Sequence, residues 1–420
     1  MNSSATRAMP IRSRRTERAL AWLLAALGAL STPAAQAHEP GADALPETPG
    51  WRAGAAIALI APKADDRWPV AAWPGVLING SAPRDQRGGL RLEHGTLDLA
   101  ARVDRHFGVQ VAAGWHDREQ VHTEAANLQA RFDRAGDEIE LRLGRDTVRM
   151  GAVIDGAGHF DRFSQPPLAK RAVLNDQWID DGLALAWRRP DADGLRGLEA
   201  GLWRGQAFPG GPTGPAVPSL HLHAGWGHVD VHLTAAHLRP EARGAAAQSL
   251  GTSGHAHGSL DCRVSLQQRV CFDGTVDVAG ASLQWEPAQG DWRVALAGLW
   301  RHDRGSLYAT SGDTRLSSRV AGAWADVTWR PAARWTLAGR FERLVPDNRL
   351  EGIGTVLLSD AAGLSNGGSV DRATAALLFE PYRQVTVSIE GGLERFAGGR
   401  VSHVALRALW RNPRWLGGSW

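Results

Sequence analysis

Sixteen strand-like segments follow one another from Trp51 to Trp410, and the connectors between them alternate between long and short. Within each segment, apolar and polar residues alternate with a period of two, as in a strand whose two faces meet different surroundings. A sheet that closes on itself in a membrane has one rim of tight turns and one rim of long loops. The pattern therefore predicts an all-β fold, a transmembrane antiparallel β-barrel of about sixteen strands with short periplasmic turns and long extracellular loops.

The expected strands are separated by turn-type sequences such as Arg134-Ala135-Gly136 and by long connectors such as 151–178. The expected long connectors are 63–87, 151–178, 208–218, 241–272, 304–317 and 347–367. The expected strands are 51–62, 88–104, 107–117, 121–133, 137–150, 179–190, 194–207, 219–227, 228–240, 273–287, 291–303, 318–331, 334–346, 368–380, 384–396 and 402–412.

The apolar face of these strands could meet lipid or the core of a soluble protein. Two observations favour lipid. Charged residues such as Arg131 and Glu140 occupy the middle of strands on the opposite face. Tryptophans also gather at strand ends, as in the aromatic girdle of a membrane barrel: Trp115, Trp187, Trp203, Trp285, Trp292, Trp329, Trp335 and Trp410. A propeller of four four-stranded blades is the soluble alternative, but it lacks the alternation of long and short connectors.

The first 37 residues have the pattern of a secretory signal. Five arginines precede the apolar run Ala19–Leu30, and Ala35-Gln36-Ala37 has the small residues of a cleavage site. We therefore divide the chain into a signal peptide (1–37), a short periplasmic leader (38–50) and the barrel (51–420). Removing the signal takes away five Arg and one Glu, which changes 47 basic and 44 acidic residues to 42 and 43. The near-neutral mature chain gives no support for nucleic-acid binding.

The signal, the amphipathic strands, the two unequal rims and the terminal aromatic Trp420 together resemble the Gram-negative outer-membrane porins. Within them, the run from Leu143 to Gly151 is similar to the phosphate-selective porin O/P group. The resemblance implies a water-filled channel for passive diffusion of small hydrophilic or ionic solutes in the outer membrane. It also implies outer-membrane lipid as a neighbour and a homotrimer as the assembly. A non-conducting barrel for binding or adhesion, with a metal associated, is the alternative.

The resemblance further implies that connector 151–178 folds inward and narrows the pore, because charges of both signs at a constriction select solutes by charge as well as by size. Its charged or titratable residues are His159, Asp161, Arg162, Lys170, Arg171 and Asp176. An external loop with solvated charges is the alternative. Eight arginines are expected on the lumen face, where they would either attract anions or pair with nearby carboxylates: Arg102, Arg131, Arg142, Arg293, Arg301, Arg340, Arg372 and Arg407.

Histidines and cysteines supply the remaining candidates. His221 and His223 share a face of one strand and His228 and His232 share a face of the next, so the hairpin is a candidate zinc or copper site or simply a polar part of the lumen. Cys262 and Cys271 are the only cysteines, and in an exported chain they predict a disulfide, with a metal thiolate pair as the alternative. The sequence contains no GxSxG, HExxH or phosphate-binding loop, so we expect neither enzymatic activity nor a cofactor.

Overall fold

The computed structural model describes residues 45–66, 68–70, 72–77, 89–116, 121–246, 260–365 and 367–419. The expected signal peptide and most of the expected leader lie outside these residues. Everything that follows concerns the unit that contains the sheet.

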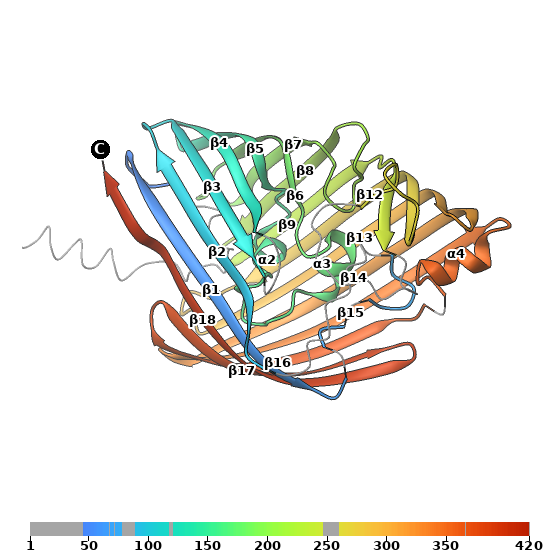
Figure 1. The fold of residues 1–420 in the computed structure, drawn as a ribbon. Coiled ribbons are helices and arrows are strands. Elements are labelled where there is room, and N and C mark those ends of the chain that lie inside the picture. The colour runs from blue at the N-terminus through green and yellow to red at the C-terminus, as the bar shows by residue number, and fades with distance from the viewer. Residues whose placement is uncertain are drawn as a thin grey trace, which may run out of the picture. The chain divides into compact units, whose positions relative to one another are not determined.

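One antiparallel sheet contains most of the described residues. Eighteen strands belong to it, and two of them, β10 (Arg243–Ala246) and β11 (Leu260–Asp261), are short additions beside the start of β12. The other sixteen pair in chain order, and β1 pairs with β18 from Gly50↔Ser419 to Ala64↔His403, which closes the ring (Figure 1). Closure leaves no free sheet edge, as a membrane requires of a β protein. The sixteen are β1 (Gly50–Ala64), β2 (Arg91–Arg102), β3 (Phe107–Trp115), β4 (His122–Arg134), β5 (Asp137–Thr147), β6 (Ile179–Arg188), β7 (Gly194–Trp203), β8 (Val217–Trp226), β9 (Val229–Leu238), β12 (Arg269–Trp285), β13 (Trp292–Ala309), β14 (Gly312–Ala332), β15 (Trp335–Glu351), β16 (Val370–Tyr382), β17 (Val385–Phe396) and β18 (Gly399–Ser419).

The fold class and the strand order predicted from the sequence are confirmed, but two of the expected long connectors are wrong. The range 304–317 belongs to β13 and β14, which continue to the two-residue turn 310–311. The first part of 347–367 extends β15 to Glu351 before helix α4 (Thr355–Ala361) begins. These sequences lack a regular apolar face because the strands there continue past the apolar outer band.

The two faces of the wall differ as the alternation predicts. On β2, Leu97 and Leu99 are half exposed on the outward face, whereas Asp98 and Arg102 are buried on the inward face. Exposed tryptophans gather at the rim of short turns, where Trp292 stacks on Trp329 with ring centroids 5.5 Å apart. This placement is typical of the interfacial aromatic belt of a membrane barrel.

Trp203 is an exception to the predicted aromatic girdle. Its neighbour Leu202 is 52% exposed on the outward face, so by alternation Trp203 points inward, where it is 2% exposed and its indole donates to Ser219 Oγ at 2.8 Å. The prediction considered only its position near a strand end and not its parity along the strand.

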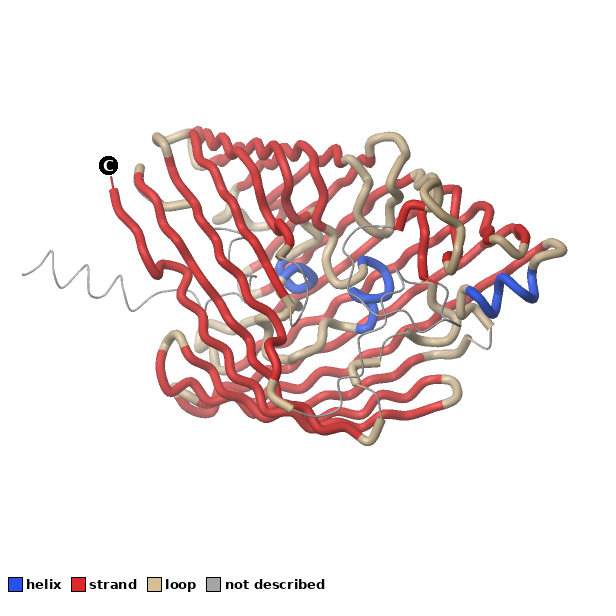
Figure 2. Tube along the Cα trace, in the orientation of Figure 1, coloured by secondary structure: helices blue, strands red, loops and turns tan. Residues whose placement is uncertain are grey.

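Two short helices lie in the connector between β5 and β6. Helix α2 (Ala152–Asp155) packs against β12 and β13, and α3 (Leu168–Leu174) packs against β13, β14 and β15. Both lie inside the ring of strands, whereas α4 lies at the rim of long connectors (Figure 2). None of the helices among the described residues is both long and apolar enough to cross a membrane.

The connector between β9 and β12 carries both cysteines. Cys262 and Cys271 form a disulfide with their Cα atoms 6.1 Å apart, and both residues are buried with Ala242. The bond ties the turn after β11 to the start of β12. No cysteine is left free in the chain.

Candidate functional site: the charged lumen and its inserted segment

Two connectors fill part of the barrel, and we call them together the plug: residues 148–178, the inserted segment, and the described residues of 68–77. Trp73 and Trp178 are almost fully buried in the plug and belong to one apolar cluster with inward-facing residues of the wall, among them Val320 and Leu344. Gly75 has a φ of +84° and packs tightly, because a Cβ there would lie 2.6 Å from the Cα of Gly367. The interior is therefore packed at the level of the plug.

The inserted segment is fastened to the wall by side chains of β13 to β18. Starting at its middle, Arg407 of β18 donates to the carbonyl of Asp161 at 2.6 Å, and Glu390 of β17 accepts from the Ser164 backbone N–H at 2.8 Å. Further along, Glu342 of β15 accepts from the N–H of Leu168 at 2.6 Å. Arg301 of β13 donates to the carbonyl of Ala172 at 2.7 Å. The segment thus crosses the inner surface from β18 back to β13.

The six residues expected at a constriction all lie inside the barrel, but they face different partners. Asp161 accepts from Arg340 at 2.8 Å and from Arg162 at 3.1 Å. Lys170 is 2% exposed and donates to the carbonyl of Ala157 at 3.1 Å. Its ammonium group therefore bonds within the inserted segment and does not face the lumen.

The remaining three are also held within the plug. Arg171 donates to the carbonyl of Val70 and lies over the ring of Trp73, 4.9 Å from its centroid. Asp176 is buried and has a positive φ of 78°. His159 stacks on His94 of the wall. Asp161 and Arg162 are therefore the charged pair of this set that the wall and the segment share.

Charge on Asp161 is maintained by its neighbours. Burial alone would raise the pKa of this carboxyl, but the guanidinium groups of Arg162 and Arg340 and the hydrogen bonds that they donate hold it well below its usual range. The carboxylate is therefore ionised at neutral pH.

The eight lumen arginines lie on the inward face, and most of them are paired. Arg102 and Arg293 contact neutral groups: Arg102 donates to the carbonyl of Pro46, and Arg293 donates to Gln284 Oε1 at 2.6 Å. The six that contact carboxylates are Arg131, Arg142, Arg301, Arg340, Arg372 and Arg407. Of the two alternatives for this set, the side chains form arginine–carboxylate ladders.

The predicted histidine hairpin is only partly brought together. His232 of β9 lies 3.0 Å from His221, measured between ring nitrogens, and stacks on His223 with centroids 4.2 Å apart. His228 lies in the turn between β8 and β9 with an exposed side chain. Its expected place on the same face as His232 is wrong, because the strand begins only at Val229.

A second group of histidines was missed by the sequence analysis. The ligand nitrogens of His94, His116 and His159 lie within 4.8 Å of one another, and they come from β2, from the residue after β3 and from the inserted segment. Their separations of 22 and 43 positions match no metal motif, so only the fold brings them together.

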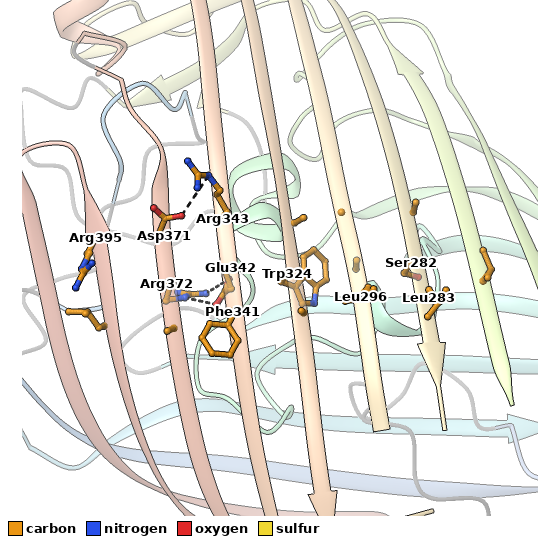
Figure 3. A pocket seen from close by; sticks show the side chains of 18 residues that line it. Ser282, Leu283, Leu296, Trp324, Phe341, Glu342, Arg343, Asp371, Arg372 and Arg395 are labelled. Carbon is orange, nitrogen blue, oxygen red and sulfur yellow. Dashed lines mark hydrogen bonds and ion pairs between the residues drawn. The ribbon is translucent and has the colours of Figure 1, made fainter. Parts of the chain in front are cut away.

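The outer surface of the wall has an apolar hollow of about 920 Å³ over β12 to β17. Leu296 and Phe341 are exposed around it, and small residues such as Gly298 and Ala323 form its floor. Glu342 and Arg372 also border the hollow, but their charged groups do not enter it. Their side chains pair with each other at 2.6 Å on the inward face (Figure 3). The hollow is therefore separated from the lumen by one thickness of sheet.

No protein-family model matches the sequence. A search of the curated proteins finds no match. Solved structures do match. Outer-membrane expressed OmpT of Vibrio cholerae has a TM-score of 0.51 at 11% identity, over 88% of this chain and 100% of that one. A trimer form of the same protein has a TM-score of 0.52 at 11% identity, over 86% and 99%. The outer-membrane channel DcaP of Acinetobacter baumannii has a TM-score of 0.50 at 11% identity, over 87% and 96%. The chain therefore has the fold of the Gram-negative outer-membrane β-barrels.

Proposed function

We propose that this chain is a porin-type channel of the outer membrane that passes small hydrophilic or ionic solutes by passive diffusion. The observation that carries the proposal is the inserted segment: a connector lies inside a closed barrel and is fastened there by Arg340, Arg407 and Glu390. Such a segment narrows a lumen without closing the ring of strands. The lumen wall towards the short turns is polar, as an aqueous path requires. No catalytic role forms part of the proposal.

Planar-bilayer recording tests this function. The purified mature barrel is expected to give discrete, voltage-independent conductance steps in potassium chloride. A barrel that inserts, shows heat-modifiable migration on gels and gives no steps would contradict the proposal.

A non-conducting barrel with a binding role is the second candidate, and the apolar interior of the plug favours it. Trp73, Trp178 and Ile154 are almost fully buried there, which is the packing of a protein core and not of an aqueous path. Under this second candidate, conductance steps would be absent from the natural chain and would appear only when the plug is loosened by substitution. The same recording therefore separates the two functions.

Charge preference of the channel is proposed to be weak. A phosphate-selective porin, the type that the sequence resembles, would need guanidinium groups that are available to an anion. Here Arg142, Arg145 and Arg149 of the matching run contact carboxylates at 2.7 Å, 3.5 Å and 3.2 Å. We therefore expect reversal potentials in gradients of potassium chloride and of potassium phosphate to be similar and small. A large anion preference in phosphate would favour the phosphate-selective type.

We further propose a homotrimer, with the apolar hollow over β12 to β17 facing either a lipid chain or a neighbouring protomer. The proposal is supported by the small residues of the hollow and by the trimer form of the similar OmpT structure. Mass measurement of the barrel in mild detergent is expected to give three chains per particle. A monomer under those conditions would leave lipid as the neighbour of this face.

A further inference from the structure

We propose that His94, His116 and His159 form a binding site for a divalent transition-metal ion of the zinc type. The site lies where the inserted segment meets β2 and β3. The proposal concerns binding and does not depend on whether the barrel conducts.

The three imidazoles are already close to the geometry of a metal site. A ring nitrogen of each histidine lies within 4.8 Å of a ring nitrogen of each of the other two, and the ring of His159 stacks on that of His94 with centroids 4.7 Å apart. Zinc–nitrogen bonds of 2.0–2.1 Å in a tetrahedral site place ligand nitrogens about 3.3 Å apart. The widest separation of 4.8 Å therefore has to close by about 1.5 Å.

The main chain at His159 is held in place by the wall. Arg407 donates to the carbonyl of His159, and the same guanidinium is held by Glu93 of β2 at 2.6 Å. The loop residue is thus attached to the strand that carries His94. A metal site that joins two elements needs this kind of fixed separation.

Hydrogen bonds around the group decide which nitrogen of His94 faces the ion. Nε2 of His94 lies 3.0 Å from Glu124 Oε1, so the proton sits on Nε2 and the lone pair on Nδ1 points to His116 and His159. Glu124 is buried on β4 and also lies 3.6 Å from Nε2 of His122. A carboxylate that orients a ligating imidazole from its far side is typical of zinc proteins and increases the basicity of the ligand.

The backbone places His116 in a similar way. Its Nδ1 lies 3.1 Å from the carbonyl oxygen of Glu93, which can only accept, so Nδ1 carries the proton and Nε2 keeps a lone pair. Three neutral imidazoles with a carboxylate behind one of them suit zinc, copper or nickel. Calcium and magnesium are disfavoured because they prefer oxygen ligands.

Zinc titration of the metal-stripped mature barrel in detergent tests the site. Calorimetry with zinc chloride is expected to give one ion per chain at the tightest site. Cobalt chloride on the natural chain is expected to give the visible bands of a tetrahedral, nitrogen-ligated ion. Absence of those bands from the folded natural chain would overturn the proposal, and this measurement requires no variant.

Substitutions assign the site to its residues. His94→Gln and His159→Gln are each expected to weaken zinc binding at least tenfold, and Glu124→Gln, which removes no ligand, is expected to weaken it about 10-fold to 100-fold. The matched control is the double substitution His221→Gln with His223→Gln, which changes two stacked lumen histidines of the other hairpin. If this control abolishes binding while His94→Gln and His159→Gln bind as the natural chain does, the ion belongs to the hairpin and the proposal is wrong. Heat-modifiable migration confirms that each variant is folded.

Discussion

The two halves of the barrel interior differ in how their inward residues are satisfied. Towards the short turns, the inward face is charged, and arginines such as Arg340 and Arg142 are buried against carboxylates. Towards the long connectors, the inward face is apolar, and residues such as Val320 and Leu344 pack against the plug. In the first half a side chain finds its partner elsewhere on the wall, as Arg340 of β15 does with Asp326 of β14. In the second half it finds its partner on a connector that returns into the barrel.

This difference assigns separate roles to charge and to packing. Arg340, Arg372 and Arg407 bond both to wall carboxylates and to the inserted segment, so they lie where the charged half meets the plug. Their charges are largely neutralised, which limits how strongly they can select ions. We infer that the plug controls how much passes and that the remaining unbalanced charges control which sign is preferred.

Removing a fully buried tryptophan of the plug should test this division most severely. Trp73 is fully buried, and its indole donates to Glu394 of β17. Trp73→Ala is expected to destabilise the packed plug by about 3–5 kcal/mol, because it leaves a cavity and removes that hydrogen bond. Single-channel recording should then show larger and more variable conductance than in the natural chain.

Trp226→Ala is the matched control, because Trp226 is 55% exposed on the outer surface at the opposite rim. Its conductance should equal that of the natural chain. If Trp73→Ala folds and conducts just as Trp226→Ala does, the plug does not control passage.

Breaking the charged contact between wall and plug should have the next largest effect. Arg340→Gln leaves Asp326 and Asp161 buried without their shared guanidinium, which typically costs 3–5 kcal/mol. Arg162 still approaches both carboxylates, so we expect a value of about 3 kcal/mol. Trypsin should then cut the inserted segment at Lys170 or Arg171 faster than in the natural chain.

The control for this experiment is Arg304→Gln, since Arg304 pairs with Asp277 at 3.7 Å on an exposed surface. Equal cleavage rates for the two variants would mean that the segment is held by packing alone.

Neutralising one carboxylate of the plug should change ion preference more than stability. Asp161→Asn leaves Arg340 bonded to Asp326 and removes one negative charge beside Arg162. The reversal potential in a potassium chloride gradient should move towards anions, whereas Asp313→Asn, at an exposed position near the start of β14, should leave it unchanged. A shift of the same size in both variants would exclude a local effect of Asp161.

The lowered pKa of Asp161 determines how the charge of this carboxylate depends on pH. Because the pKa of Asp161 is held well below the usual aspartate range, its stabilising contribution is present above that range and is lost only as the pH falls through the lowered value. Ion preference due to Asp161 should therefore stay constant from neutral pH down through the ordinary range of aspartate titration. A change within that range would show that Asp161 titrates normally.

The fold could be predicted from the sequence because lipid imposes one requirement on every outward position. Residues such as Leu97 and Leu99 alternate with Asp98 regardless of what lies elsewhere in the chain. Each turn can likewise be recognised from its own few residues. The interior has no such rule. Trp68, Trp73 and Val76 are apolar residues in an expected external loop, and this was the available signal that the connector returns into the barrel.

The candidate site could be predicted only where its partners are close in sequence. Pairs such as Arg131 with Glu140 and Arg340 with Asp326 join neighbouring strands, so pairing was one of the expected alternatives. The group of His94, His116 and His159 depends on where the inserted segment passes the wall, which alternation does not determine. The hairpin that holds His221 and His223 is visible in the sequence, but His228 was placed in the strand by starting that strand one residue early.

The smallest effect is expected for a charged pair on the outward face of the wall. Such a pair contacts neither the charged half of the interior nor the plug. Arg343 and Asp371 lie 3.8 Å apart at the edge of the outer hollow, and their side chains are 65% and 51% exposed. An exposed pair of this kind contributes about 0–1 kcal/mol, so Arg343→Ala should leave thermal stability, trypsin cleavage and conductance close to those of the natural chain. If Arg343→Ala instead lowers the mass of the particle in mild detergent from three chains to one, the outer face and not the interior depends on this charge, and the hollow is the contact between protomers.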